Sequence, residues 1–297
     1  ASVDWSHELL GPEERVLFRR LGIFARGFTV DAADVVVAFD PVPDRATLDV
    51  LARLVDKSLV HLDDPGRYRL LETIRQYALD RLADAGETEE LRDRHLAWAG
   101  NLARTLESEA TDAHPAALDE LETEHANLRA ALDWAAVAGR HDRALEIVGS
   151  LAFFWAQHGH YREAADWESR LVERPGSTGG QVVARARWGC AYVRFYGGDA
   201  VGAYQRAQIG LTEANAAGDS STAARCLHTM GAGLYPADPV LARQHLVQAA
   251  ELARTAQDQW CLADALQLAG YTHLAEGDHR LAVPLLEEAF PIWNRRG

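Results

Sequence analysis

The sequence predicts a mainly α-helical protein, in which a small domain of helices and one β-hairpin precedes a solenoid of stacked helical hairpins. Two observations carry this prediction. The first 87 residues mix helical and strand patterns, and tight turns recur at a nearly constant spacing from residue 159 to residue 277. The length of 297 residues also favours more than one unit. We expect the first domain over residues 1–87, a helical linker over 88–137 and the solenoid over 138–297.

Three helices are expected in the early part of the first domain. The first begins at Pro12, because proline fits the first turn of a helix and the acidic residues after it suit the positive end of the helix dipole. Apolar residues continue at helical spacing until Gly27, which we expect to end this helix. A second short helix should end at Val37, and a third should place Leu48 and Leu51 on one apolar face.

A β-hairpin is expected next. Two strand-like segments, residues 58–62 and 67–71, flank turn residues 63–66. Three helices followed by a two-stranded wing is the element order of a winged-helix domain. A further helix should cover residues 72–83 and stop at Gly86, and every segment after Thr88 has a helical pattern.

The turns of the second half have a period. Gly159, Gly198, Ala237 and Gly277 form one series, separated by 39, 39 and 40 residues. Five residues after each of them stands an alanine, which lets the two helices of a hairpin approach closely. We therefore expect four hairpins of about 39 residues each, stacked as a solenoid. The alanines are Ala164, Ala203, Ala242 and Ala282; the first helices should span 142–157, 181–196, 220–235 and 259–275, and the second helices 161–173, 199–216, 238–256 and 279–294.

Charge and composition disfavour several classes of function. The net charge is −14, so the chain as a whole should be repelled by phosphate backbones. Residues 1–94 carry 13 basic and 19 acidic residues, and the third helix sets Asp49 and Asp56 beside Arg53 and Lys57. No run of about 20 apolar residues is present, so no membrane span is expected. Three cysteines without a CxxC pair should be buried, reduced thiols, which indicates the cytoplasm.

The chain carries no catalytic or phosphate-binding motif. It has no GxxxxGK[ST], GxSxG or HExxH segment, and its single lysine is Lys57. The best histidine cluster, His141, His158 and His160, lies at turns and has no cysteine at zinc spacing, so we expect hydrogen-bonded turn residues and no metal site. We therefore expect a protein that is not an enzyme and that holds no cofactor itself.

Aromatic residues on the first helices of the hairpins are the candidate binding residues. The hairpins resemble those of tetratricopeptide solenoids, a resemblance which implies that the first helices line the concave face. An aromatic groove there suits a peptide, a protein segment or a flat small molecule. The alternative is that these side chains form the core between repeats. Polar tips next to turns favour the groove for Tyr196 and Tyr235. The candidate residues are Phe153, Trp188, Tyr192, Phe195, Tyr196, Tyr235 and Tyr271.

Two resemblances to known families rest on these patterns. The Gly-Asp turns and the alanine early in each second helix resemble the tetratricopeptide repeat, whose usual length of about 34 residues is shorter. A second set of segments is residues 4–6, 10–15, 18–21, 51–60 and 68–78, with Glu122, His125 and residues 127–134 in the linker. This set resembles the large bacterial STAND-type ATPase regulators, which include LuxR-type and antibiotic-pathway transcription activators.

The second resemblance implies an order of P-loop ATPase core, winged helix, helical linker and repeat sensor, with an output module at one terminus. This chain has no phosphate loop, so the ATPase core is absent from it, and no output module is evident. In related ATPases a Met-His-Asp motif ends the wing, and its histidine senses bound ADP. The equivalent stretch here is Leu70-Leu71-Glu72, and Leu71 cannot donate a hydrogen bond to a phosphate. Direct nucleotide sensing by this domain is therefore not expected.

The sequence thus predicts a cytoplasmic, non-enzymatic sensor or regulatory arm of a STAND-type ATP-dependent transcriptional regulator. Its expected partners are a protein or a small-molecule inducer at the concave repeat face, and the ATPase core of the parent protein. ATP is expected only for that missing core, and direct contact with nucleic acid or a membrane is not expected. Two alternatives stay open: a free-standing repeat adaptor for protein–protein interaction, and a winged-helix protein that binds DNA.

Overall fold

The structure, a computed structural model, describes residues 2–40, 47–63, 66–111, 114–173, 180–235 and 237–296. Helices dominate it, which confirms the predicted mainly α-helical class. It divides into two compact units: unit 1 contains residues 1–102 and 120–140, and unit 2 contains residues 103–119 and 141–297. Residues 88–137, predicted as a linker, contribute to both units. The proposed limits of the linker stay a prediction.

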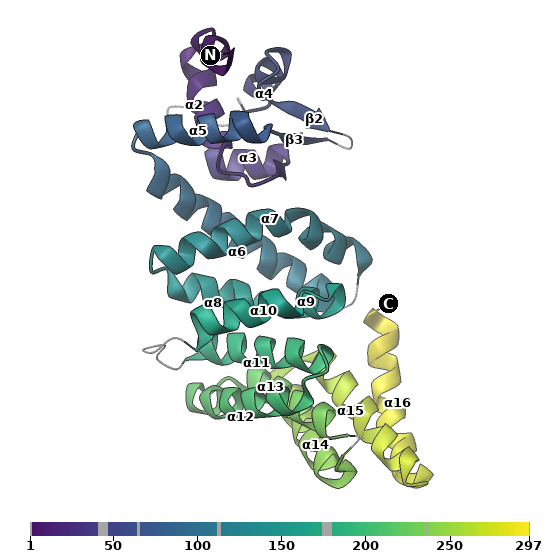
Figure 1. The fold of residues 1–297 in the computed structure, drawn as a ribbon. Coiled ribbons are helices and arrows are strands. Elements are labelled where there is room, and N and C mark those ends of the chain that lie inside the picture. Colours follow the sequence, from purple (N-terminus) through teal and green to yellow (C-terminus); the bar gives the residue numbers. More distant parts are fainter. Residues whose placement is uncertain are drawn as a thin grey trace. The chain divides into compact units, whose positions relative to one another are not determined.

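Unit 1 begins with the expected winged-helix order of elements (Figure 1). The three strands form one antiparallel sheet in the order β1-β3-β2. The predicted turn over residues 63–66 lies partly outside the described residues. The elements are α1 (Ser2–Glu8), α2 (Pro12–Leu21), β1 (Gly27–Phe28), α3 (Val30–Val37), α4 (Thr47–Asp56), β2 (His61–Asp63), β3 (Arg67–Arg69) and α5 (Glu72–Asp84).

The first of the predicted helices is shorter than expected, and β1 was not predicted. Helix α2 ends at Leu21 instead of continuing to Gly27. A Cβ at Gly22 would lie 3.0 Å from the Cβ of Ala78, so the glycine lets the end of α2 lie close against α5. The chain after it turns into the sheet, where Gly27 pairs with Arg69 of β3. The helical prediction extended past Gly22 because Ile23 and Phe24 are apolar. These two residues are buried in the structure, but they are not part of a helix.

Aromatic rings hold the sheet and helices of this domain together. Phe24 and Phe28 stack with their centroids 4.7 Å apart, and Phe28 stacks on Tyr68 at 6.0 Å. Phe18 of α2 is fully buried in the same cluster. Each such buried side chain contributes roughly 1.5–3 kcal/mol relative to an exposed one.

Helices α6 (Thr88–Thr111) and α7 (Pro115–Val137) complete unit 1 with their residues 88–102 and 120–137. The buried Asn127 of α7 accepts a hydrogen bond from the Ala25 N–H and donates one to the Gly27 carbonyl, which fixes α7 to the start of β1. Asp93 of α6 accepts from the Trp134 indole and pairs with Arg140. Residues 127–134 belong to the segments that resemble STAND-type ATPase regulators. In the structure this segment packs on the winged-helix domain.

A buried arginine joins the helices of the winged-helix domain. Arg20 is 1% exposed and donates to the carbonyls of Val37, Phe39 and Asp40. The carboxylate of Glu87 accepts from Arg20 and from Arg19. Burial alone would raise the pKa of Glu87, but the hydrogen bonds and charges of the two arginines outweigh it and lower the pKa to about 2.

Glu87→Gln is expected to lower the free energy of unfolding by about 3 kcal/mol at neutral pH. Because the folded-state pKa of Glu87 is depressed, its contribution is present above the unfolded value near 4.5 and is lost as the pH falls toward about 2. The free energies of unfolding of wild type and Glu87→Gln, measured with urea, should therefore converge as the pH falls between these two values. Glu90→Gln, at an exposed position of α6, should leave stability unchanged across the range. A constant gap between wild type and Glu87→Gln down to pH 2 would contradict this account.

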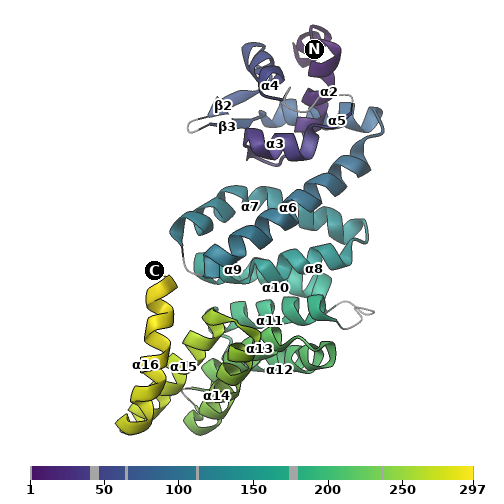
Figure 2. The ribbon, with the colours of Figure 1, turned by 180° about the vertical axis from the view of Figure 1, so that it is seen from behind.

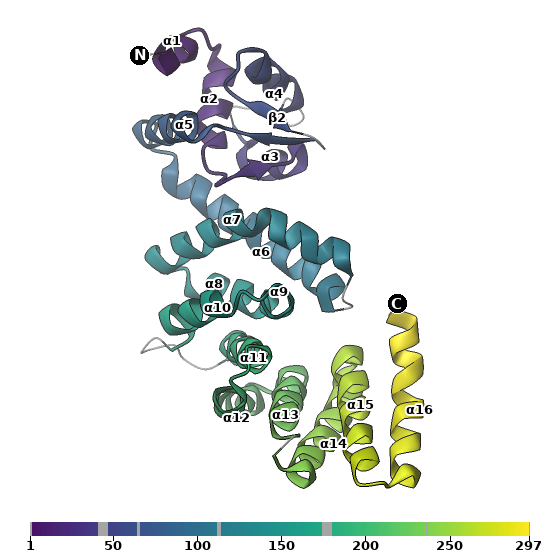
Figure 3. The same ribbon diagram turned by 45° about the vertical axis from the view of Figure 1, so that its right-hand side comes forward.

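Unit 2 contains the four predicted hairpins (Figures 1 and 2). The two helices of the first hairpin differ from the prediction, since the first is interrupted at Leu151 and the second ends in a π-helical turn. The later helices match the predicted ranges closely, and α15 and α16 lie side by side in Figure 3. The elements are α8 (His141–Ser150), α9 (Ala152–His158), α10 (Tyr161–Trp167), η1 (Glu168–Val172), α11 (Gln181–Tyr196), α12 (Ala200–Ala217), α13 (Ser220–Leu234), α14 (Pro239–Ala256), α15 (Gln259–Ala275) and α16 (His279–Arg296).

A glycine followed by an aspartate forms three of the turns between helices of unit 2, at residues 198–199, 218–219 and 277–278. Gly198 and Gly218 adopt the left-handed conformation, with φ of 87° and 69°, which glycine reaches without strain. The aspartate that follows caps the next helix: Asp199 accepts from the Gly202 N–H, and Asp219 from the Thr222 N–H. Asp238, Asp258 and Asp278 accept from backbone N–H groups in the same way. The Gly-Asp signature of the sequence is thus a helix stop followed by a helix start.

Close helix contacts explain the periodic small residues. Ala203, Ala242 and Ala282 are 0% exposed, and Ala164 is 2% exposed, as the period predicts. Gly231 on α13 allows a similar approach, because a Cβ there would lie 2.7 Å from the Leu246 side chain of α14.

Ala203→Leu is expected to lower the free energy of unfolding by about 1–3 kcal/mol, because three added heavy atoms overpack the contact between α11 and α12. Thermal or urea unfolding followed by circular dichroism measures this. Gln248→Leu, at an exposed position of α14, is the control and should change little. Arg206 is unsuitable as a control, because it is half-buried and pairs with the buried Glu168. An Ala203→Leu variant with wild-type stability would show that the repeat register is wrong.

Candidate functional site

The first helices of the hairpins in unit 2 bring four large aromatic rings together. Phe153 of α9 lies 5.0 Å from Tyr192 of α11 and 4.8 Å from Trp260 of α15, measured between ring centroids. Trp188 of α11 lies 5.7 Å from Phe153. None of the four is more than 6% exposed. Phe153, Trp188 and Tyr192 are therefore interior residues, as the core alternative expected, and they do not line an open groove.

Arg225 of α13 lies against this cluster, and sequence analysis did not identify it. Its Cζ atom is 4.8 Å from the Trp188 ring, 5.7 Å from Trp260 and 5.9 Å from Phe153. Such contacts between a cation and an aromatic face stabilise a guanidinium that is shielded from water. A charged residue within the largely apolar segment 223–227 was the one sequence signal that could have found it.

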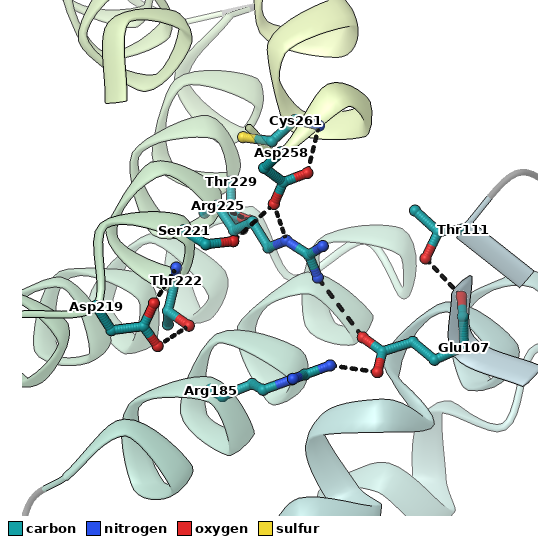
Figure 4. A network of polar contacts seen from close by, with 10 residues as sticks. All are labelled: Glu107, Thr111, Arg185, Asp219, Ser221, Thr222, Arg225, Thr229, Asp258 and Cys261. Carbon is teal, nitrogen blue, oxygen red and sulfur yellow. Dashed lines mark hydrogen bonds and ion pairs between the residues drawn. The ribbon is translucent and has the colours of Figure 1, made fainter. Parts of the chain in front are cut away.

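Two carboxylates from other helices neutralise Arg225, as Figure 4 shows. The Nε of Arg225 donates to Oδ2 of Asp258 at 2.5 Å, and its terminal nitrogen lies 3.6 Å from Oε1 of Glu107. Glu107 also pairs with Arg185. Asp258 accepts two further hydrogen bonds, from the Ser221 hydroxyl and the Cys261 N–H. Two arginines thus face two carboxylates, and the network carries no net charge.

The network controls the ionisation of its members. Burial alone would raise the pKa of Asp258, but the charge of Arg225 and the hydrogen bonds it receives outweigh burial and lower it. Burial raises the pKa of the Cys261 thiol well above its usual value. Burial likewise raises the pKa of the Cys190 and Cys226 thiols, and all three cysteines are free and buried, as expected.

A cavity of about 390 Å³ lies beside this network in unit 2. Arg225, Asp258 and Trp260 form part of its wall, together with hydroxyl and amide side chains such as Ser221 and Gln257. This cavity and the aromatic cluster make the inner side of the hairpins the candidate functional site of unit 2.

The other predicted binding residues lie nearer the surface. Tyr196 is 44% exposed and Tyr271 is 41% exposed, while Phe195 and Tyr235 are half-buried. The Tyr196 ring lies 4.8 Å from Tyr192, so it extends the aromatic cluster outward. Burial raises the pKa of Tyr192 and of Tyr196. In the described residues, Tyr235 and Tyr271 make no ring contact with the other five.

In unit 1, the charge on the surface of α4 indicates whether the winged-helix domain can bind a phosphate backbone. Its cations are engaged by acidic residues of α2, since Arg53 pairs with Glu13 and Glu14, and Lys57, just after α4, pairs with Glu14. The exposed positions of α4 include Asp49 and Leu48, and Leu48 was wrongly predicted to share the apolar face with the buried Leu51. This surface has little positive charge to offer a phosphate backbone.

Comparison with known proteins agrees with this architecture. Residues 10–83 match the protein family described as winged helix-turn-helix domain. The chain is 36% identical over 290 residues to "Putative HTH-type transcriptional regulator Rv0890c" of Mycobacterium tuberculosis, which covers 94% of this chain and 32% of the relative. It is 29% identical to "Regulatory protein AfsR" of Streptomyces griseus, covering 99% of this chain and 32% of that protein. The chain thus spans about a third of the length of these curated relatives.

Two solved structures are also similar, at low scores. BtubC from P. vanneervenii has a TM-score of 0.48 and 16% identity, covering 68% of this chain and 90% of BtubC. A STAND protein with a tetratricopeptide repeat sensor from Pyrococcus horikoshii has a TM-score of 0.40 and 14% identity, covering 97% of this chain and 52% of that protein. Scores this low do not establish a common fold. No helix in the described residues combines the length and apolar character needed to cross a bilayer.

Proposed function

We propose that this chain is the non-enzymatic regulatory arm of a STAND-type ATP-dependent transcriptional regulator that acts in the cytoplasm. In this proposal the hairpins receive an inducer or a protein partner, and the winged helix transmits the signal to an ATPase core that the chain itself does not contain. The observation that carries it is the winged-helix domain followed by helical hairpins within a stretch that is similar, over 94% of the chain, to a relative named as a transcriptional regulator.

The winged helix acts in this proposal as an adaptor between the hairpins and the core. Support comes from α4, whose basic residues pair with Glu13 and Glu14. Support also comes from Leu71, which caps the start of α5 without a side-chain hydrogen bond and offers no donor to a nucleotide. The purified chain should therefore not bind ATP, and calorimetry that measures a micromolar affinity for ATP would contradict the proposal.

DNA binding is the second candidate function, favoured by the match to a winged helix-turn-helix family. An electrophoretic shift assay with duplex DNA at several salt concentrations separates the two. The adaptor role predicts no retained DNA at about 0.1 M salt. Binding whose affinity falls steeply with salt would instead assign phosphate contacts to this domain.

The exposed ends of the aromatic series are the proposed contacts of the inducer or partner. Tyr196 and Tyr271 are exposed, and rigid aromatic rings bury a large area at small entropic cost. In a strain where the intact protein controls a reporter gene, Tyr196→Ala should raise the inducer level for half-maximal response about fivefold, which corresponds to about 1 kcal/mol. An unchanged response together with a large loss of stability would make Tyr196 a structural residue.

A further inference from the structure

A second cavity lies inside unit 1, where the winged-helix domain meets α6 and α7. Its volume is about 350 Å³, which is within the usual range for small-molecule sites. Ile23 and Leu79 line it from the winged-helix domain, Arg92 and His95 from α6, and Trp134 from α7. One small molecule in this cavity would contact both sides of the junction.

His95 gives this cavity an unsatisfied polar group. The residue is 2% exposed, and its Nε2 atom has no hydrogen-bond partner in the described part of the chain. Burial lowers the pKa of His95 to about 4, so the imidazole is uncharged at neutral pH. Leaving a buried polar atom unpaired is unfavourable, and a ligand in the cavity is one means of pairing it.

The remaining walls combine an aromatic surface with a cation. The Cζ atom of Arg92 lies 5.0 Å from the Trp134 ring centroid, and in the described residues this guanidinium has no carboxylate partner. The indole N–H of Trp134 donates to Asp93, which fixes the ring. Arg75, which also lines the cavity, pairs with Glu72. Asp133 is the acidic residue in the wall, and Arg92 is the cation of the lining that an anionic ligand would meet.

We propose that this cavity binds a small aromatic monoanion, such as an aromatic carboxylate. The ring would pack against Ile23, Leu79 and Trp134, and the anionic group would pair with Arg92. The inference deepens the proposed regulatory function, on which its biological meaning rests, by giving the regulator a ligand site at the junction of the winged helix with α6 and α7.

Titration calorimetry of the whole chain with naphthalene-2-carboxylate tests the site. We expect one saturable site with a dissociation constant on the order of 0.1 mM, a modest affinity that suits so small a ligand. Arg92→Met should weaken binding about tenfold or more. The uncharged probe 2-naphthamide should bind about tenfold more weakly to wild type and equally to Arg92→Met. Arg81→Met is the matched control, because Arg81 also lies over an aromatic ring, that of Tyr77, outside the cavity.

Filling the cavity gives an independent test. Ala130→Leu adds three heavy atoms at the cavity wall and should abolish binding, whereas Ala83→Leu, at an exposed position of α5, should bind as wild type. Circular dichroism checks that both variants are folded. The absence of saturable binding up to about 5 mM, or equal binding by wild type, Arg92→Met and Ala130→Leu, would overturn the site. Either result leaves the regulatory function standing, because that function is tested by ATPase control and not by this probe.

Discussion

Arg225→Met is expected to lower the free energy of unfolding of unit 2 by about 3–5 kcal/mol, because it leaves buried carboxylates without their cation. The methionine keeps much of the volume against Trp188 but removes the charge. The side chains of Asp258 and Glu107 are 6% and 7% exposed. Glu107 would then keep Arg185 as its cation, whereas Asp258 would lose the cation that it pairs with. Urea unfolding followed by circular dichroism measures the loss.

An exposed ion pair of the same kind serves as the control for Arg225. Arg254 pairs with Glu288 at 2.7 Å, and both side chains are nearly half exposed. Arg254→Met should therefore cost no more than about 1 kcal/mol. If Arg225→Met and Arg254→Met lowered the free energy of unfolding equally, Arg225 would behave like a member of an exposed ion pair. The network around it would then not be a buried one.

Trp188→Ala is expected to lower the free energy of unfolding by about 3–5 kcal/mol, because it empties the centre of the aromatic cluster. Trp188 is 0% exposed and contacts the rings of Phe153 and Tyr192. Its indole N–H has no hydrogen-bond partner in the described residues. Trp188→Phe should therefore cost much less, since it keeps an aromatic ring and loses no hydrogen bond. Thermal and urea unfolding of the two variants measure the difference.

The exposed Trp5 of α1 provides the matched control, because it is 65% exposed and Trp5→Ala removes the same side chain from the surface. That change should have little effect on stability. A Trp188→Ala variant as stable as Trp5→Ala would show that Trp188 is not a core residue. The aromatic residues would then line the groove that was predicted from the sequence.

The repeat architecture could be predicted from the sequence because local chemistry determines it. A left-handed Gly198 followed by the capping Asp199 ends one helix and begins the next, and the same pair recurs at Gly218 and Asp219. Alanines such as Ala242 mark the contact between the two helices of a hairpin. These signals act within a few residues, so period and position were enough to place the helices.

The features that the sequence missed depend on contacts between distant residues. Strand β1 is two residues long and exists through its pairing with Arg69 and Tyr68, which lie far along the chain. Arg225 of α13 meets Glu107 of α6 and Asp258, the residue before α15, and no spacing pattern reports that convergence. The division of the aromatic set into buried Trp188 and exposed Tyr196 likewise follows from packing in space.

The proposed regulatory function implies that this arm holds the ATPase core of the intact protein inactive, and ATP hydrolysis by the intact protein with and without residues 181–296 measures this directly. Removing these helices takes away most of the hairpins in which the inducer or partner is proposed to act. The account predicts a clear rise in the basal rate of hydrolysis after the deletion, with the remaining protein folded by circular dichroism. An unchanged basal rate in a folded deletion protein, or an intact protein that does not hydrolyse ATP, would contradict it.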